Sequence, residues 1–348
     1  MSMQTILVLF GGCSTEYEVS LQSAHAVLQA LDHSRYVPLT VGITREGRWL
    51  RYSGSLFHLE TGDWASQPDC VPCALSLDRG DLRLLWLDGS GKSEEFDAAF
   101  PILHGKNGED GTVQGLLELM GAPIVGCGAL SSALCMDKDR AHKLAALAGV
   151  RVPRSCLFHR GAVLPQMARA AEDLGYPLFV KPVRAGSSFG VSKVNGPDQL
   201  PAAVWTAFAH DREILLEEAI PGFEVGCAVM GSDELTVGAV DEIQLTDGFF
   251  DYTEKYNLIT SRIYCPARIS PEKAAEIQET AKSVYRALDC RVFARVDMFL
   301  TPWGEIVFNE VNTIPGFTAH SRYPGMMKAV GWEFGNLVNR LVELGVEA

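Results

Sequence analysis

The chain has 348 residues, of which 47% are hydrophobic and 21% are charged, so it is long enough for roughly two or three domains with buried cores and is not a disordered segment. Its 43 acidic and 30 basic residues give a net charge of -13, which argues against a nucleic-acid partner and favours a small molecule. The start carries no basic stretch, and its apolar run at 6–10 is too short for a signal or membrane segment, so we expect a cytoplasmic protein without a membrane partner.

The first third of the sequence alternates short apolar strands with helices. Strands are expected at 5–10, 36–43 and 96–103, and helices follow the first of them, after Gly11-Gly12, and the last, after Gly111. Such alternation predicts a parallel sheet covered on both faces, with ligands held at the carboxyl ends of its strands.

The pattern changes near residue 130. A helical stretch at 131–148 ends at Gly149, and short strands follow from residue 176 onward. An amphipathic helix is expected at 271–288. The order predicts an α/β domain followed by mixed α+β domains.

The nine cysteines are odd in number and scattered, which is typical of reduced thiols. Cys70 and Cys73 form a C-x-x-C pair, but no second pair lies nearby, so we do not expect a zinc site there.

A lysine lies near the end of the apolar strand expected at 178–183, and a glycine- and serine-rich segment follows at 186–190. A lysine in such a strand is not expected to stay buried without an anion, and glycine-rich loops surround phosphates with their backbone N-H groups. The Walker pattern G-x-x-x-x-G-K is absent. We interpret Lys181 and the loop as a triphosphate site with the loop as its lid; the alternative is a plain hairpin turn.

The apolar strand expected at 213–219 ends in acidic residues beside a proline turn. Carboxylates there are suited to accept hydrogen bonds from adenine or ribose, so we assign Glu217 and Glu224 to a nucleotide site. The alternative is a solvated strand edge.

The segment 291–312 reads as a hairpin, with turn residues at 301–304 between two strand-like runs. If Leu300 pairs with Glu305, Asp297 lies opposite Phe308. Because side chains alternate between faces, four polar residues are then expected on one face: Arg295, Asp297, Glu310 and Asn312. Three oxygen ligands there suit Mg²⁺; the alternative is a salt-bridged polar face on an exposed hairpin.

Four segments in chain order carry a family resemblance. They are Glu16-Tyr-Glu-Val-Ser-Leu after the glycine pair, His104-Gly105 followed by Gly-Glu-Asp-Gly, Lys181 before Gly-Ser-Ser-x-Gly, and Asn309-Glu-Val-Asn-Thr-Ile-Pro-Gly316. Together they resemble the D-alanine:D-alanine ligases of the ATP-grasp superfamily, over residues 11–324. The resemblance implies a homodimer with an α/β and α+β, ATP-grasp fold behind a Rossmann-like parallel sheet. The implied domains are a substrate-binding domain at 1–130, a central ATP-grasp subdomain at 131–220, and a C-terminal subdomain with the metal and second-substrate sites at 221–348.

The resemblance also implies the reaction. ATP phosphorylates the carboxylate of a first D-alanine, and the amine of a second D-amino acid then displaces phosphate, so catalysis relies on positioning and charge neutralisation. By matched position, ATP is bound by Lys138, Lys181, Ser188, Glu217, Ala219, Glu224 and Lys255. A pair of Mg²⁺ ions, with Mn²⁺ as a substitute, is assigned to Asp297, Glu310 and Asn312. The catalytic residues implied are Glu16, which holds the ammonium of the first D-alanine, Ser187 and Tyr256, which link a lid to Glu16, and Arg295 and the Gly316 N-H, which stabilise the oxyanion.

The subtype rests on fewer positions. The segment 249–256 matches the lid of ligases that use an amine nucleophile, whereas D-lactate-using ligases carry a different lid with a histidine. His104 is similar to a residue near the first substrate, and Ser321 to one at the carboxylate of the second. Three positions match type G vancomycin-resistance ligases, whose second substrate is D-serine: Asp241, Phe250 and Arg322.

The resemblance therefore implies a ligase that forms a D-alanyl-D-serine dipeptide for peptidoglycan precursors. The alternatives are a housekeeping D-alanine:D-alanine ligase, an amino-acid-binding protein, which usually needs export, and a non-catalytic nucleotide sensor. For Arg322, the alternative is a surface arginine or a partner for an acid.

Overall fold

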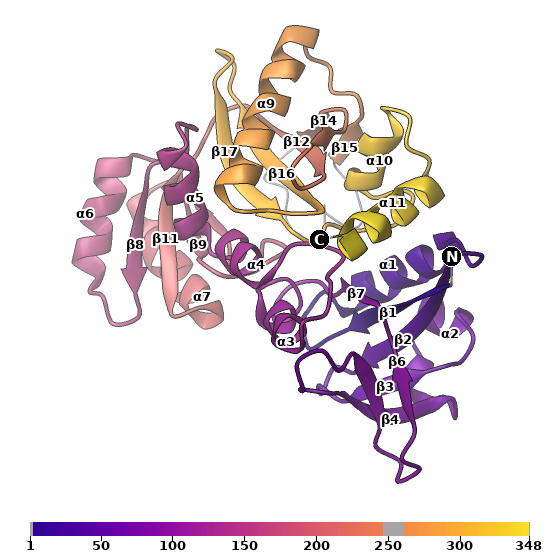
Figure 1. Cartoon of the computed structure of the whole chain (residues 1–348). Coiled ribbons are helices and arrows are strands. Elements are labelled where there is room, and N and C mark those ends of the chain that lie inside the picture. Colours follow the sequence, from indigo (N-terminus) through magenta and orange to yellow (C-terminus); the bar gives the residue numbers. More distant parts are fainter. Residues whose placement is uncertain (1–2, 246–260, 348) are drawn as a thin grey trace.

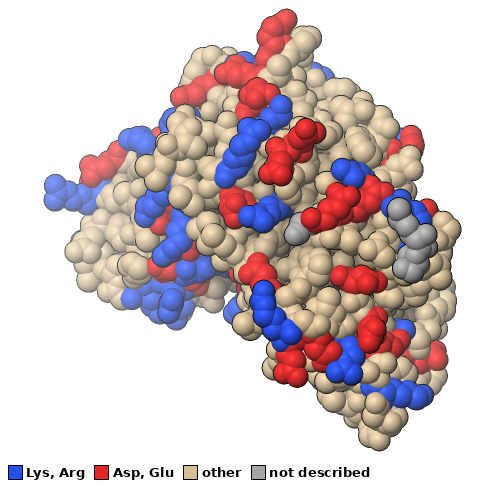
Figure 2. Space-filling model, viewed as in Figure 1, with Lys and Arg blue, Asp and Glu red and all other residues tan. Residues whose placement is uncertain are grey.

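The computed structural model describes residues 3–245 and 261–347, and within these residues the chain forms three lobes, each built on one sheet (Figure 1). No helix in these two stretches is long and apolar enough to cross a membrane. On the face drawn in Figure 2, acidic and basic side chains are interspersed over the lobes, so the net charge of -13 is not gathered into one patch there.

The first lobe holds a seven-stranded sheet in the order β6-β5-β4-β3-β2-β1-β7. Its strands are β1 (Gln4–Gly11), β2 (Tyr36–Ile43), β3 (Trp49–Tyr52), β4 (Cys70–Leu75), β5 (Arg83–Trp86), β6 (Ser93–Glu95) and β7 (Ala98–Ile102). Its helices are α1 (Tyr17–Ala30), α2 (Phe57–Thr61) and α3 (Thr112–Met120). Only β2, β1 and β7 pair in parallel, and the other strands form an antiparallel meander. The parallel sheet expected from the sequence is therefore confined to three strands.

The helical stretch expected at 131–148 is two helices, α4 (Ala129–Met136) and α5 (Lys138–Leu147). Asp137 separates them because it leaves helical geometry, and its carboxylate caps α5 by accepting a hydrogen bond from Arg140 N. The prediction of a single helix was wrong at this residue.

The second lobe holds a four-stranded antiparallel sheet in the order β10-β9-β11-β8. Its strands are β8 (Ser155–His159), β9 (Leu178–Pro182), β10 (Ser192–Val194) and β11 (Glu213–Glu218). Helices α6 (Leu164–Leu174) and α7 (Leu200–His210) cover it with apolar side chains. The glycine- and serine-rich loop 185–191 connects β9 to β10.

The third lobe holds a six-stranded sheet in which β12 and β16 are central. Its strands are β12 (Phe223–Met230), β13 (Thr236–Val237), β14 (Asp241–Leu245), β15 (Ser261–Tyr264), β16 (Phe293–Leu300) and β17 (Ile306–Asn312). Its helices are α9 (Pro271–Ala287), α10 (Arg322–Lys328) and α11 (Phe334–Glu347).

The hairpin β16–β17 has a different register from the one expected. Leu300 pairs with Ile306 because the turn extends over 301–305, where the N-H of Glu305 donates to Thr301 Oγ1 at 2.9 Å. A bulge next to Asp297 shifts the register again, so Asp297 lies opposite Glu310 rather than Phe308. The two shifts preserve side-chain alternation for the polar residues. The expected shared face is therefore confirmed although the expected register is wrong.

The first and third lobes share one hydrophobic core. Phe100 on β7 contacts Phe293 on β16 with ring centroids 6.3 Å apart, and α11 packs against α1 (Figure 1). Asn339 of α11 accepts a hydrogen bond at 2.9 Å from the N-H of Asp32, which follows α1. The last helix of the chain thus completes the packing of the first sheet.

Candidate active site

Two adjoining cavities lie where the three lobes meet. The larger, of about 320 Å³, is lined by Lys181 and Glu217 of the second lobe and by Glu224 of the third. The smaller contains Glu16 of the first lobe. Lys138 and Glu310 line both cavities and so stand between them.

The polar residues on the shared face of the β16–β17 hairpin form a buried, charged hydrogen-bond network. Arg295 donates to both carboxylate oxygens of Asp297, at 2.8 and 2.6 Å, and Asn312 Nδ2 donates to the same carboxylate at 2.9 Å. Burial alone would raise the pKa of Asp297, but the guanidinium groups of Arg295 and Arg322 outweigh it and hold this pKa below its ordinary value. Glu310 lies 3.3 Å from Lys138 Nζ. The exposed salt-bridged face considered as an alternative is excluded for Asp297, which is only 1% exposed.

Arg322 is buried and held by carboxylates, not exposed on the surface. Its guanidinium bonds Asp241 through two N-H groups at 2.7 and 2.8 Å, Glu224 at 2.7 Å, and lies 3.4 Å from Asp297. Burial opposes its charge, but Asp241 and the other acids raise the pKa of Arg322 well above its ordinary value. Glu224, which the sequence assigned to ATP alone, thus lines the larger cavity and also bonds Arg322.

Gly226 on β12 makes room for this ion pair, and no sequence motif pointed to it. It lies opposite both Asp241 and Asp297 in the sheet. A Cβ atom at Gly226 would stand 2.5 Å from Arg322 Nη2 and 2.7 Å from Asp241 Oδ1, closer than real contacts allow. The guanidinium is fixed by its acids and has little freedom to move away.

Gly226→Ala is therefore expected to lower the free energy of unfolding by about 1–3 kcal/mol, as overpacking does in other cores. Gly325→Ala is the matched control, because a Cβ at Gly325 would meet no atom within 4 Å. Denaturant unfolding of both variants measures the difference. Equal stability of the two would show that the Arg322 pair tolerates displacement.

Lys181 is buried and paired with Glu217, whose Oε1 lies 2.6 Å from its Nζ. Glu217 Oε2 is also buried and has no hydrogen-bond partner among the described residues. His142 Nδ1, 3.7 Å away, likewise has none, while its Nε2 bonds the carbonyl of Asn309 at 2.8 Å. Burial lowers the pKa of His142, so the ring is neutral at pH 7. His142 is a second residue that the sequence analysis missed.

The loop of the second lobe reaches the first lobe. Ser187 Oγ donates a hydrogen bond to Glu16, as the resemblance implied, and Lys138 Nζ donates to the carbonyl of Ala185 at 3.0 Å. Ser187 and Ser188 both have positive φ, 50° and 58°, so the loop is tightly turned here. Phe250, Lys255 and Tyr256, with the rest of the expected lid, lie outside the described residues.

His104 positions a segment rather than facing solvent. Its Nδ1 bonds the carbonyl of Ile314 at 2.9 Å, which requires the proton on Nδ1, and its Nε2 accepts from Ser23 Oγ at 3.1 Å. Ser23 Oγ in turn accepts from the N-H of Phe317 at 3.1 Å. Burial lowers the pKa of His104, so the ring is neutral. The histidine thereby supports both ends of the short segment that contains Gly316.

Two expected residues remain to be placed. Ser321 directly precedes α10, and a Cβ at Gly316 would stand 3.3 Å from its Oγ. Ala219 lines the larger cavity. The described residues assigned to ATP, with Glu16, Ser187, Glu310 and Asn312, thus line the two cavities, and the Arg322 group is joined to them through Glu224.

Comparisons with known proteins give a consistent result. The family model "D-ala D-ala ligase N-terminus" matches residues 5–127, and "D-ala D-ala ligase C-terminus" matches residues 144–343. The chain is 43% identical to vancomycin C-type resistance protein VanC1 of Enterococcus gallinarum, over 99% of both chains. It is 41% identical to a D-alanine–D-alanine ligase of Caldicellulosiruptor bescii, over 100% of this chain and 96% of that protein.

Solved structures agree. The VanG D-Ala:D-Ser ligase from Enterococcus faecalis matches with a TM-score of 0.93 and 54% identity, over 99% of this chain and 100% of that one. The D-alanine-D-alanine ligase from Coxiella burnetii matches with a TM-score of 0.89 and 31% identity, over 100% of this chain and 95% of that one. The three-lobe architecture is the ATP-grasp fold of these enzymes, as expected from the sequence. The chain belongs to the D-alanine–D-alanine ligase family.

Proposed function

We propose that the chain joins D-alanine to a second D-amino acid at the expense of ATP, with D-serine as the preferred second substrate. The observation that carries this proposal is the single cleft in which Lys138 and Glu310 stand between a cavity with buried Lys181 and a cavity with Glu16. That arrangement suits transfer of a phosphoryl group from a nucleotide to a carboxylate held at Glu16.

The larger cavity suits ATP. Glu217 Oε2 is a buried acceptor without a partner among the described residues, and the exocyclic amine of adenine is a donor that would satisfy it. Lys181 and Lys138 would neutralise phosphate oxygens, with Ser188 and the loop N-H groups closing over them. Ala219 would lie against the base or ribose.

The donor set of the hairpin also fits Mg²⁺. Asp297, Glu310 and Asn312 provide carboxylate and amide oxygens, the ligands this hard cation prefers, and the Asn312 Nδ2 bond to Asp297 leaves its amide oxygen for a metal. When bound, Mg²⁺ supplies charge neutralisation for the transferring phosphoryl group. Arg295 and the Gly316 N-H would stabilise the oxyanion formed when the second amine attacks.

The buried Arg322 favours D-serine. A guanidinium carries five N-H groups, and among the described residues three of them bond Asp241 and Glu224 while Nη2 also lies 3.4 Å from Asp297, so the second N-H of Nη1 is left for a substrate hydroxyl. An equal mixture of D-alanine, D-serine and D-lactate with ATP tests the proposal by mass spectrometry of the products. We expect mainly D-alanyl-D-serine and little D-lactate product. Mainly D-alanyl-D-alanine would indicate the housekeeping function, and ATP binding without turnover would indicate a sensor.

Lys181→Ala is expected to weaken ATP binding by about 10- to 150-fold, because a charge-assisted contact is worth roughly 1.5–3 kcal/mol. Lys193→Ala is the matched control, since Lys193 lines the same cavity but is exposed. Calorimetric titration with ATP measures both variants. An unchanged affinity in Lys181→Ala would show that the lysine serves only as the structural partner of Glu217.

The proposed activity also suggests where the enzyme acts and what role it has. ATP and peptidoglycan precursors are supplied in the cytoplasm, where we expect the enzyme to act, with a role in vancomycin resistance if D-serine is the substrate. We retain the division into residues 1–130, 131–220 and 221–348, and we expect a homodimer, which sedimentation analysis would detect.

A further inference from the structure

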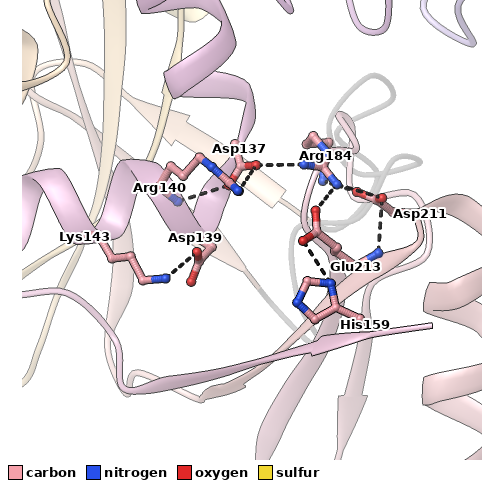
Figure 3. A network of polar contacts seen from close by, with 8 residues as sticks. All are labelled: Asp137, Asp139, Arg140, Lys143, His159, Arg184, Asp211 and Glu213. Atoms are coloured by element: carbon pink, nitrogen blue, oxygen red, sulfur yellow. Dashed lines mark hydrogen bonds and ion pairs between the residues drawn. The ribbon is translucent and has the colours of Figure 1, made fainter. Parts of the chain in front are cut away.

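Arg184 is the last residue before the glycine- and serine-rich loop and binds three carboxylates, one at the start of α5 and two in the short segment where α7 ends and β11 begins (Figure 3). Its guanidinium lies 3.0 Å from Asp137, 3.2 Å from Asp211, and in contact with Glu213. Its backbone N-H also donates to Asp211 at 2.9 Å. One side chain therefore joins the end of α7, the start of β11 and the junction of α4 with α5.

The three carboxylates are well buried, with side chains 4%, 9% and 8% exposed for Asp137, Asp211 and Glu213. Buried carboxylates need cations, and the only other arginine or lysine that reaches them among the described residues is Arg140, 2.6 Å from Asp137; the ring of His159 lies 3.2 Å from Glu213 (Figure 3). Asp211 has Arg184 as its cation. The cluster is thus organised around Arg184.

The contact with Asp137 is the one that reaches the active site. Asp137 caps α5, and the next residue, Lys138, has its Nζ in the cleft. Lys138 already meets the second lobe twice, through its N-H to the carbonyl of Val183 at 3.3 Å and through its Nζ to the carbonyl of Ala185 at 3.0 Å. Arg184 lies between Val183 and Ala185 in the sequence and adds a third contact between this segment and the start of α5, through Asp137.

We propose that Arg184 is a positioning residue for phosphoryl transfer: it fixes the loop at 185–191 and the Lys138 end of α5 as one rigid unit. The inference rests on the proposed function, because the ligand that this unit receives is the triphosphate. Cations that are already held in place need no reorganisation when they bind a phosphate. Loosening the loop and the Lys138 end of α5 should therefore weaken binding of the phosphates but not of the adenine base. Arg184 itself touches no substrate in this scheme.

The test compares two arginines that share one carboxylate. Arg184→Met removes the ion pair that links the second lobe to Asp137 at the start of α5. Arg140→Met removes the other ion pair of Asp137, which is formed within α5. The readout is the ratio of ATP affinity to adenosine affinity, because adenosine probes the base site without phosphates. We expect Arg184→Met to lower this ratio by about 10- to 100-fold, the scale of one charge-assisted phosphate contact. Arg140→Met should leave the ratio unchanged.

A double-variant cycle with Asp137→Asn adds a second readout. Asparagine keeps the helix cap, so this change removes mainly the charge that Arg184 holds. If Arg184 acts through Asp137, the double variant should lose no more phosphate affinity than the worse single variant. Additive losses, an equal effect of Arg140→Met, or parallel loss of ATP and adenosine affinity with a lower Tm would overturn the proposal.

Failure of the ligase proposal gives a different result. Wild-type protein that binds ATP more tightly than adenosine but forms no dipeptide would contradict the ligase function and leave the role of Arg184 to be decided by the variants. Wild-type protein with no preference for ATP would contradict both.

Discussion

Replacing Glu310 by glutamine is expected to lower the rate of ATP-dependent phosphate release by at least about 100-fold. Changing a residue that merely supports a metal ligand already costs roughly 10- to 100-fold, and Glu310 is proposed to be a ligand itself. An amide oxygen lacks the charge that a hard cation prefers. Loss of the carboxylate also removes the charged partner 3.3 Å from Lys138, so the ammonium proposed to bind phosphate is held less firmly.

Glu305→Gln is the matched control on the same hairpin. Glu305 lies in the turn, 3.5 Å from Arg151 and away from the polar face. Both variants should unfold at a temperature close to that of the wild type, because Glu310 and Glu305 are both partly exposed. Near-normal phosphate release by Glu310→Gln at saturating Mg²⁺ would rule out the metal assignment.

Arg322→Met is expected to change the product and to weaken the fold. Without the guanidinium, a site that bonds a substrate hydroxyl loses its donor, so the ratio of D-alanyl-D-alanine to D-alanyl-D-serine should rise. The same change leaves Asp241, Glu224 and Asp297 without their shared cation. Removing one partner of a buried ion pair costs about 3–5 kcal/mol, so the free energy of unfolding should fall by that order.

The product ratio should therefore be measured at a temperature at which the variant remains folded, as monitored by circular dichroism. Arg268→Met is the control, since Arg268 pairs with Glu242 next to Asp241 but its side chain is half exposed. It should alter neither the ratio nor, by more than about 1 kcal/mol, the stability. An unchanged preference for D-serine in Arg322→Met would remove this arginine from substrate recognition and leave it a purely structural role.

Strongly periodic segments were predictable from the sequence. The strand at 36–43 and the helix at 271–288 are found almost as expected, because local apolar spacing determines them. The meander β3 to β6 was missed, since its strands are short and its pairing depends on contacts distant in sequence. The break at Asp137 was missed because a capping aspartate inside a helical pattern looks like an ordinary helix residue.

The residues of the candidate site also differ in how far the sequence could predict them. Motifs singled out Glu310 and Lys181, which line the cleft, and Asp297, which Asn312 joins to it. Residues that act through shape or through other residues left no such signal. Gly226 matters because a Cβ would not fit there, and Arg184 matters because its three carboxylate partners come from two segments that are distant in the sequence. The polar face of the hairpin was predicted correctly although the register was wrong. The register differs by one residue at the turn and by one more at the bulge, and a total shift of two residues leaves each side chain on the expected face.

The shared core of the first and third lobes bears on how the chain is made. A chain leaves the ribosome from its N-terminus, yet α1 and β7 pack against helix α11, and the contact of Asp32 with Asn339 spans 307 residues. Apolar side chains of the first lobe that α11 covers therefore stay exposed until residues 334–347 have been synthesised. Native packing of this lobe needs a contact of high sequence separation, which slows folding and prolongs the exposure of surface that can aggregate.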